Sequence, residues 1–394
     1  MQPPRPTSST VDAMSAVLAA AYLSGVGNLV VNVQPIVLGA LADGYHLGDG
    51  ALGQIGAAYI GFSSLSSLTA PLWIRRVNWR YTSLIAVVSC VALMALGAAT
   101  SQTTWLLVLF SLIGAAQGAV AAPVFAALGD NRNPERAFAV SIVVQSVIAA
   151  AMQILLASYV VPRAGAHGMF ISLAIVTASA GIAAMWLPTR GRSMEMSSAR
   201  GDAVAPAIPL RAALPCAVAL AALGLFTAGL LGFWYFVERI GAARGMAHGT
   251  IGLALGLGSI ANVASSGLVA WLGGRASTRV PIAAGSLILL LAFIVLQLDG
   301  DVAYIACNMM FSFGFGLAQP AYLAVVRKVD ATNRLFVAAG GVIGAAGVVI
   351  GLVAGPIIGL GGYKAMILVA AGFVVAGAVL LGISAKMRAP VAAA

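Results

Sequence analysis

Amide side chains are the groups in this chain best suited to recognising a solute, because they occur inside long apolar stretches that hold few other polar groups. Ten amides lie within such stretches: Asn28, Asn32, Gln34, Gln54, Gln117, Gln145, Gln153, Asn262, Asn308 and Gln319. An amide in hydrocarbon is costly unless it is hydrogen-bonded, so it marks a bundle interior or a water-filled path. Asn28 and Asn32 share one helix face, shortly before Pro35, which frees a backbone carbonyl.

Each amide taken alone is explained as well by an interhelical hydrogen bond, worth about 0.6 to 2 kcal/mol. As a group, the amides are better explained as the lining of a substrate path, which the aromatic residues of a neighbouring stretch could complete. The predicted path consists of Asn28, Asn32, Gln34, Gln117, Gln145, Gln153, Trp234, Tyr235, Asn262, Asn308 and Gln319. For Trp234 and Tyr235 an interfacial aromatic belt is the alternative.

Ionisable side chains are absent from the middle third of every expected membrane span. A proton carrier at the midplane therefore has no obvious residue. Asp43 and Glu238, at the outer ends of their spans, are the candidates for proton coupling, and a solvated surface charge is the alternative for both. The missing counter-charge favours a neutral or amphiphilic organic solute, although helix termini could still hold an anion.

Twelve apolar runs must position these residues. The chain has 394 residues, 61% of them hydrophobic, and a mean hydropathy of +1.01, against roughly 45–50% apolar residues in soluble domains. A run of about 20 apolar residues crosses a bilayer as a helix. We expect spanning helices at 13–40, 50–73, 81–100, 104–128, 137–161, 168–188, 213–237, 247–272, 280–298, 302–326, 335–358 and 363–385.

The break at 189–212 is the longest polar segment between these runs and divides them into two sets of six. The expected organisation is a tail (1–12), an N-terminal six-helix bundle (13–188), a linker (189–212), a C-terminal six-helix bundle (213–385) and a second tail (386–394). Seventeen of the 21 Lys and Arg residues then fall on one side, which places tails and linker in the cytoplasm. The net charge of +10 follows from this topology and from attraction to lipid headgroups, so we expect no nucleic-acid partner.

The two halves of the chain resemble each other. The stretch GQIGAAYIG (53–61) precedes GTIGLALGL (249–257) by 196 positions. An alignment at about the same spacing matches Pro123 with Pro320 and Arg136 with Arg334. Equivalent positions in both halves indicate a duplicated six-helix unit, as in some transporters.

Twelve helices, a central cytoplasmic loop, the duplication and an Arg-rich turn together resemble the major facilitator superfamily of secondary transporters, over essentially the whole chain. The family's turn is Gly-x-x-x-Asp-Arg-x-Gly-Arg-Arg. In APLWIRRVNWRY (70–81) Arg75 takes the place of the Asp, Arg76 and Arg80 take basic positions, and Asn78 replaces the second glycine. The resemblance implies cytoplasmic gate loops that contain Arg75, Arg76, Arg80, Arg275 and Arg279. Two family signatures are missing: Gly114 stands where the fourth helix of the family has Arg, and the fifth helix lacks the Gly-Pro motif of drug antiporters.

Small residues form stripes on two of the expected helices. Glycines recur every three or four residues from 340 to 355, and a matching stripe runs from 53 to 64. The resemblance implies that these two helices meet between the bundles. The predicted interbundle contact consists of Gly53, Gly61, Gly344, Gly347, Gly351 and Gly355; it could slide during transport or be static packing.

Motifs for catalysis are lacking: the chain has no HExxH sequence and no phosphate-binding glycine loop. Cys90, Cys216 and Cys307 are spread over three apolar runs, which favours neither a metal site nor a disulfide. We therefore expect no enzyme, no cofactor and no metal. The sequence predicts an all-α integral membrane protein, a monomer in a bacterial inner membrane, that transports a small organic solute by alternating access, actively or passively. An exporter of amphiphilic drugs and a transporter-like sensor or scaffold without flux remain as alternatives.

Overall fold

The computed structural model describes residues 13–100, 102–190, 210–272, 277–330 and 338–387, and helices make up nearly all of these ranges. The first half of the chain contains α1 (Met14–Gly27), α2 (Leu29–Tyr45), α3 (Asp49–Trp73), α4 (Trp79–Ala99), α5 (Thr103–Gly129), α6 (Pro134–Leu155), the π-helical turn η2 (Leu156–Val160) and α7 (Val161–Ala184). The second half contains α8 (Leu210–Trp234), α9 (Val237–Ala243), α10 (His248–Leu272), α11 (Arg279–Val295), α12 (Asp301–Val329) and α13 (Ala339–Lys386).

The twelve expected spans all correspond to helix, although the boundaries differ. Eight stretches of the described helices are long and apolar enough to cross a membrane. Two of these stretches, Arg136–Ala184 and Ala339–Ser384, each hold two of the expected spans. The remaining two spans correspond to α3 and the shorter helix α11. Within the expected linker at 189–212, residues 191–209 lie outside the described residues. Helix α8 begins at Leu210, inside the expected linker and three residues before the expected start of the second bundle.

Glycine marks the points where the two longest stretches turn. Gly165 inside α7 and Gly362 inside α13 have φ values of 55° and 64°, in the left-handed region that other residues rarely adopt. The first expected span is also interrupted. At Asn28 the backbone leaves helical geometry, and the Asn28 Nδ2 atom donates to the Ser24 carbonyl at 3.0 Å. This break places the Asn28 side chain where two helical segments meet.

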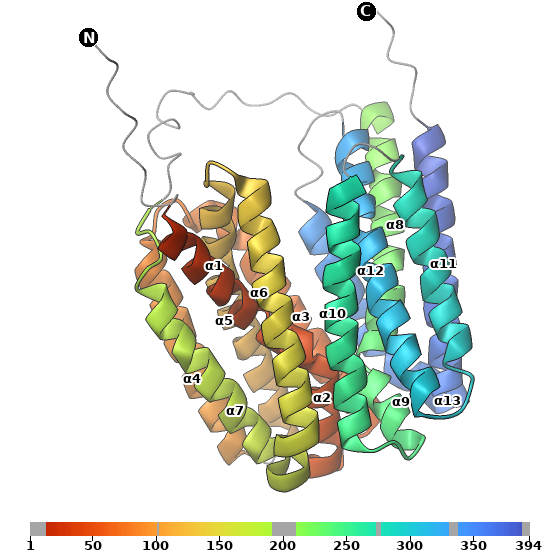
Figure 1. Ribbon diagram of the computed structural model, residues 1–394, viewed down its shortest axis with the longest axis horizontal. Helices are drawn as coiled ribbons and strands as arrows, with labels where there is room; N and C mark the ends of the chain where they lie inside the picture. Colours follow the sequence, from red (N-terminus) through yellow and green to blue (C-terminus); the bar gives the residue numbers. More distant parts are fainter. Residues whose placement is uncertain (1–12, 101, 191–209, 273–276, 331–337, 388–394) are drawn as a thin grey trace, which may run out of the picture.

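The helices form two bundles that lie side by side in Figure 1, α1 to α7 in one and α8 to α13 in the other. The main contacts between them are those of α3 with α13, of α6 and η2 with α10, and of α2 with α9. The contact between α2 and α9 lies at the end opposite to the start of α1 and the end of α13 (Figure 1). We call this end the closed end, and the other end the terminal end.

Large apolar side chains cover much of the outer surface. Ile85 on α4, Ile175 on α7 and Leu368 on α13 are 68%, 64% and 73% exposed. In water such a surface would promote aggregation, whereas hydrocarbon is a favourable solvent for it. The outer surface therefore suits a lipid environment, and the polar residues inside the helices must find their partners in the interior.

Candidate functional site

A central cavity of about 400 Å³ lies between the two bundles. It is lined by residues of α2, α3, α6, α8, α10, α12 and α13, together with Asn28 at the break before α2. Its polar lining consists of Asn28, Asn32, Ser64, Gln145, Gln153, Thr227, Ser259, Asn262, Ser312 and Gln319. None of the described residues that line it is an Asp, Glu, Lys, Arg or His. The cavity is thus rich in neutral hydrogen-bonding groups.

Seven of the eleven residues of the predicted path line this cavity: Asn28, Asn32, Gln145, Gln153, Trp234, Asn262 and Gln319. The sequence could identify them because a polar side chain in an apolar helix is placed toward the interior of a bundle. Their positions bring residues from distant parts of the chain to one cavity.

The other four residues of the predicted path lie outside the lining and have packing contacts. Gln117 accepts a hydrogen bond from the Tyr59 hydroxyl at 2.6 Å, and Asn308 donates to the Tyr304 carbonyl at 2.9 Å. Tyr235 donates to the Gly347 carbonyl at 3.2 Å, and Gln34 is 2% exposed. For Gln117 and Asn308 the simpler interpretation, a hydrogen bond within or between helices, describes the observed geometry. Tyr235 is fully buried, so the interfacial aromatic belt does not describe it.

Aromatic side chains of the lining come from the second bundle alone. Trp234 lies at the end of α8, and Phe311 and Phe315 lie four residues apart on α12. The Trp234 and Phe311 rings are nearly parallel, with an interplanar angle of 5° and centroids 6.5 Å apart. Phe311 also contacts the ring of Phe233 at a centroid distance of 4.6 Å. We call Trp234, Phe311 and Phe315 the aromatic wall.

Two hydrogen bonds beside the cavity join the bundles, one between Ser259 and Gln153 and one between Trp234 and Val31. Gln153 on α6 donates through Nε2 to the Asn32 carbonyl at 2.7 Å and accepts at Oε1 from the Ser259 hydroxyl of α10 at 2.9 Å. The Trp234 indole N–H donates to the Val31 carbonyl of α2 at 3.0 Å. The oxygen and the nitrogen of the Gln153 amide are therefore both hydrogen-bonded to protein, which makes Gln153 a structural link as well as a lining residue.

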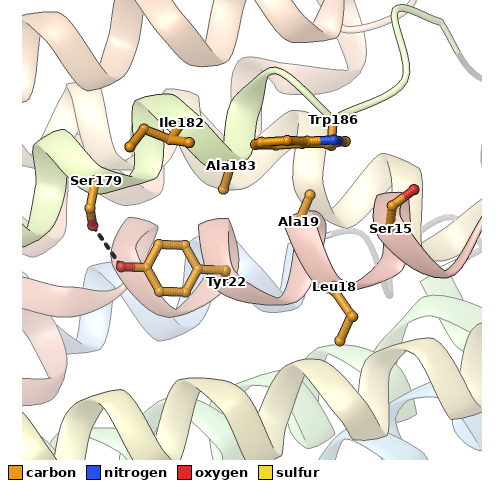
Figure 2. A pocket seen from close by; sticks show the side chains of 8 residues that line it. All are labelled: Ser15, Leu18, Ala19, Tyr22, Ser179, Ile182, Ala183 and Trp186. Atoms are coloured by element: carbon orange, nitrogen blue, oxygen red, sulfur yellow. Dashed lines mark hydrogen bonds between the residues drawn. The ribbon is translucent and has the colours of Figure 1, made fainter.

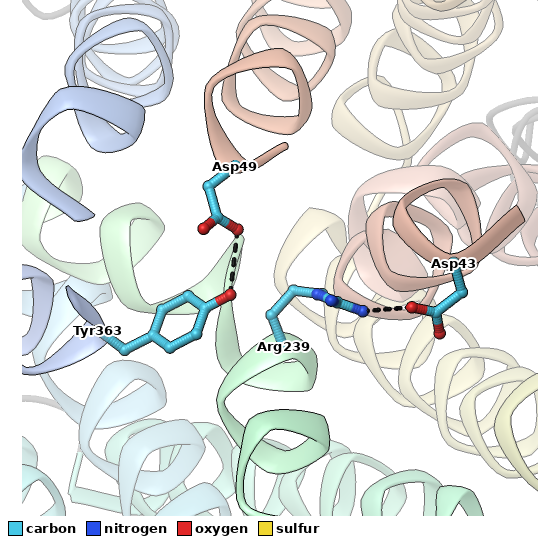
Figure 3. A network of polar contacts seen from close by, with 4 residues as sticks. All are labelled: Asp43, Asp49, Arg239 and Tyr363. Carbon is cyan, nitrogen blue, oxygen red and sulfur yellow. Dashed lines mark hydrogen bonds and ion pairs between the residues drawn. The ribbon is translucent and has the colours of Figure 1, made fainter. Parts of the chain in front are cut away.

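A network of polar contacts connects the bundles at the closed end (Figure 3). The Arg239 guanidinium of α9 lies 2.6 Å from the Asp43 carboxylate of α2. The Tyr363 hydroxyl of α13 donates to the Asp49 carboxylate of α3 at 3.0 Å. In Figure 3 the Arg239 side chain lies between Asp43 and Tyr363.

Glu238 precedes Arg239 and lies in the same contact between α2 and α9. Its side chain is 4% exposed, and its Oε2 atom has no hydrogen-bond partner among the described residues. A methyl group added at Gly39 of α2 would collide with the Glu238 carboxyl group. The missing side chain at Gly39 therefore makes room for this carboxyl group. Both candidates for proton coupling, Asp43 and Glu238, thus lie at the closed end.

Glycines of α13 pack directly against α3. A Cβ atom at Gly351 would lie 2.6 Å from the Gly53 carbonyl oxygen, and one at Gly347 would lie 2.7 Å from Ile60. The structure places all the glycines of the predicted interbundle contact against the partner helix: Gly53, Gly61, Gly344, Gly347, Gly351 and Gly355. Such close backbone approach requires small residues on both faces.

The arginines predicted for the gate loops lie at the terminal end or outside the described residues. Arg75, in the turn after α3, lies 3.6 Å from the Asp130 carboxylate at the end of α5, and Arg80 donates to the Leu187 carbonyl at 3.1 Å. Arg76 and Arg279 are exposed, and Arg275 falls outside the described residues. The Arg75 and Asp130 pair joins elements of the first bundle only.

A second hollow is a shallow groove between α1 and α7 on the outside of the first bundle (Figure 2). Ser15, Leu18 and Tyr22 line it on one side and Ile182 and Trp186 on the other. The Tyr22 and Ser179 hydroxyl groups lie 2.6 Å apart and satisfy each other. This leaves the groove with few free polar groups, so the central cavity is the stronger candidate site.

Sequence reasoning missed the hydroxyl groups and two of the aromatic residues of the lining: Ser64, Thr227, Ser259, Ser312, Phe311 and Phe315. Helical spacing could have found the aromatic pair. Phe311, Phe315 and Gln319 follow one another at intervals of four, so they share the face that Gln319 identifies. Hydroxyl groups carry no such signal, since Ser and Thr often bond to their own helix.

A family model described as Major Facilitator Superfamily matches residues 16–339 of the chain. No curated protein sequence matches it. Among solved structures, the nucleoside transporter NupG has a TM-score of 0.70 at 12% identity, with 95% of this chain and 99% of that chain covered. An aspartate-to-alanine variant of NupG gives a TM-score of 0.73 at 12% identity, with 95% and 100% covered.

A bacterial homologue of the human lysosomal transporter Spinster, solved in an inward-facing and unoccupied conformation, has a TM-score of 0.62 at 13% identity. The alignment covers 94% of this chain and 95% of that chain. At these identities the likeness concerns the fold.

Proposed function

This chain belongs to the major facilitator superfamily, and from that membership we propose that it carries a small neutral or amphiphilic organic solute across a bacterial cytoplasmic membrane by alternating access. The family membership confirms the fold class predicted from the sequence, an all-α integral membrane protein, and its general role in membrane transport. The predicted count of twelve spanning helices is consistent with this family. The single observation that carries the choice of solute is the central cavity, with six amides and no ionisable side chain in its described lining.

A neutral solute fits this cavity because no Asp, Glu, Lys, Arg or His in its described lining supplies a counter-charge. Moving an ion from water into a site without a counter-charge costs several kcal/mol or more. A neutral solute exchanges its water hydrogen bonds for those of the amides at little net cost. The volume of about 400 Å³ is within the range of roughly 300–1,000 Å³ that small-molecule sites occupy.

Alternating access requires the closed end to open and the terminal end to close. Opening would separate α2 from α9 and α3 from α13, which breaks the Asp43 to Arg239 ion pair and the Asp49 to Tyr363 hydrogen bond. These are a few solvent-accessible contacts together with smooth glycine faces, and both can separate at modest cost. By the distribution of Lys and Arg, the closed end faces the outside and both chain termini face the cytoplasm.

For proton coupling we assign Glu238 in preference to Asp43. Asp43 is half exposed and already paired with Arg239, whereas Glu238 is 4% exposed inside the contact that must open. The charged or titratable groups near Glu238 are Asp43 on α2, Arg239 on α9 and Tyr304 on α12. A carboxyl group that meets outside water when this contact opens, and loses that access when the contact closes, would bind its proton in one state of the cycle and release it in the other, as coupling requires.

Counterflow tests the proposal without knowledge of the direction of transport. Proteoliposomes are loaded with one unlabelled solute at a time, and the entry of the same labelled solute is measured. The panel contains neutral nucleosides, hexoses and neutral amides, together with benzoate and benzyltrimethylammonium as charged solutes. Liposomes without protein are the control. We expect counterflow for at least one neutral solute. Counterflow for charged solutes alone would overturn the neutral-solute proposal, and binding without counterflow would favour a sensor or scaffold.

A further inference from the structure

The central cavity is uneven in the side chains that its two bundles supply. All three aromatic residues of the lining, the aromatic wall of Trp234, Phe311 and Phe315, come from the second bundle. Four of the six amides come from the first bundle: Asn28, Asn32, Gln145 and Gln153. A bound solute therefore meets aromatic side chains on one side and mostly amide groups on the other.

Two of the three rings of the aromatic wall, those of Phe311 and Trp234, are held by their neighbours. Phe311 packs against Phe233 and Phe293, at centroid distances of 4.6 and 6.3 Å. Trp234 is nearly parallel to Phe311, and its indole N–H is fixed by the Val31 carbonyl. Rings that are already ordered lose little further freedom on binding, so they favour a flat partner that can stack on them.

The amide side retains hydrogen-bonding capacity. Gln145 lines the cavity, and within the described part of the chain its side chain has no hydrogen bond. Asn28 uses its Nδ2 group for the Ser24 carbonyl, which leaves its Oδ1 atom to accept. Each primary amide offers both an acceptor and donors, so its best complement is a group that also has both.

We infer that the transported solute is a neutral heteroaromatic molecule, whose ring stacks on the aromatic wall while donor and acceptor atoms on its rim bond to Asn28 and Gln145. The inference rests on the proposed function and narrows its substrate class. A ringless solute would leave the aromatic wall without a flat partner. An aromatic ion would place its charge among amides and aliphatic side chains such as Leu230 and Ile343.

Direct binding to the purified full-length protein in nanodiscs tests this inference. The ring probes are uridine, adenosine, adenine, nicotinamide and indole-3-carboxamide. Ribose and glucose are the probes without an aromatic ring, and benzoate and benzyltrimethylammonium are the charged aromatic probes. We expect at least one ring probe to bind at least about tenfold more tightly than every probe of the other two groups.

Two cavity variants, each with a matched control, test whether the ring probes bind in the central cavity. Phe315→Leu removes a ring from the aromatic wall, and Phe125→Leu removes an exposed ring on α5. Gln145→Leu removes an unbonded cavity amide, and Gln54→Leu removes an exposed amide on α3. We expect each cavity variant to weaken the best ring probe at least about fivefold and each control to change its affinity less than twofold.

The outcomes separate this inference from the proposed function. Ring probes that bind in the cavity but show no counterflow would overturn transport and leave the inference intact. Counterflow of hexoses together with no binding of any ring probe would overturn the inference and leave transport intact. Equal loss of binding in Phe315→Leu and Phe125→Leu, or tighter binding of a charged probe, would also overturn it.

Discussion

The Asp43 carboxylate and the Arg239 guanidinium lie 2.6 Å apart and form an ion pair between the first and second bundles. They are 196 positions apart in the chain. Their side chains are 50% and 25% exposed, so the pair is open to water and contributes little to overall stability. Its place in the closed end gives it a different role, since it is made only while α2 and α9 are in contact.

Breaking this pair should shift the conformational balance. We expect Asp43→Asn to increase the population in which the closed end is open. The free energy of unfolding should fall by no more than about 1 kcal/mol, so the melting temperature should change little. Distances between spin labels on α2 and α9 report the population. The double variant Asp43→Arg with Arg239→Asp should restore the distance distribution of the wild type. Arg163→Gln, on the exposed surface of the first bundle, is the control. An unchanged distance distribution in Asp43→Asn would contradict the assignment.

Glu238→Gln should separate transport from proton movement. The amide keeps the size of the buried side chain and cannot release a proton, so we expect counterflow to persist while the pH dependence of net transport disappears. Uptake into proteoliposomes under an imposed pH gradient measures this. Asp43→Asn should retain the pH dependence. If Glu238→Gln responds to the gradient as the wild type does, Glu238 is not the coupling residue.

Gly351→Leu should block the cycle without unfolding the protein. A Cβ atom at this position lies 2.6 Å from the Gly53 carbonyl oxygen, so a leucine forces α13 away from α3 and keeps the closed end from forming. We expect counterflow to fall at least about tenfold. The variant should still be monodisperse and melt cooperatively, which shows that it is folded. Gly359→Leu is the matched control on α13, because no atom lies within 4 Å of a Cβ there. Normal counterflow in folded Gly351→Leu would show that the contact is dispensable.

Gln153→Leu should destabilise the protein more than the loss of any other cavity amide. It removes hydrogen bonds to the Asn32 carbonyl and the Ser259 hydroxyl and leaves both groups without that partner, at a cost of about 1–3 kcal/mol. Thermal melting in detergent measures the loss, with Gln145→Leu as the comparison because its side chain has no such bonds in the described structure. Equal melting temperatures for the two variants would argue against the linking role of Gln153.

Orientation is tested with single cysteines in a variant that lacks Cys90, Cys216 and Cys307. If the terminal end faces the cytoplasm, Arg76→Cys should be protected from an impermeant thiol reagent in intact cells, and Arg163→Cys should react. Both positions are exposed, so access of the reagent depends on the side of the membrane. The opposite pattern would reverse the proposed topology and place the closed end inside.

The sequence by itself determined that this protein lies in a membrane, and it identified many of the polar side chains that face its interior. Long apolar runs cross a bilayer only as helices, because the backbone must satisfy its own hydrogen bonds. The same cost of burying polar groups directs amides such as Asn32 and Gln145 inward, and both line the cavity. Local composition is sufficient for these predictions because the energy of each residue in hydrocarbon depends mainly on its own polarity.

Only the tertiary structure decided which amides meet. Gln117 and Gln145 are similar in sequence context, yet Gln117 is hydrogen-bonded to Tyr59 and Val26 while Gln145 faces the cavity. The ion pair of Asp43 with Arg239 and the burial of Glu238 against Gly39 likewise depend on how α2 meets α9. Such contacts join residues far apart in the chain, and they follow from the packing of whole helices rather than from any local pattern of residues.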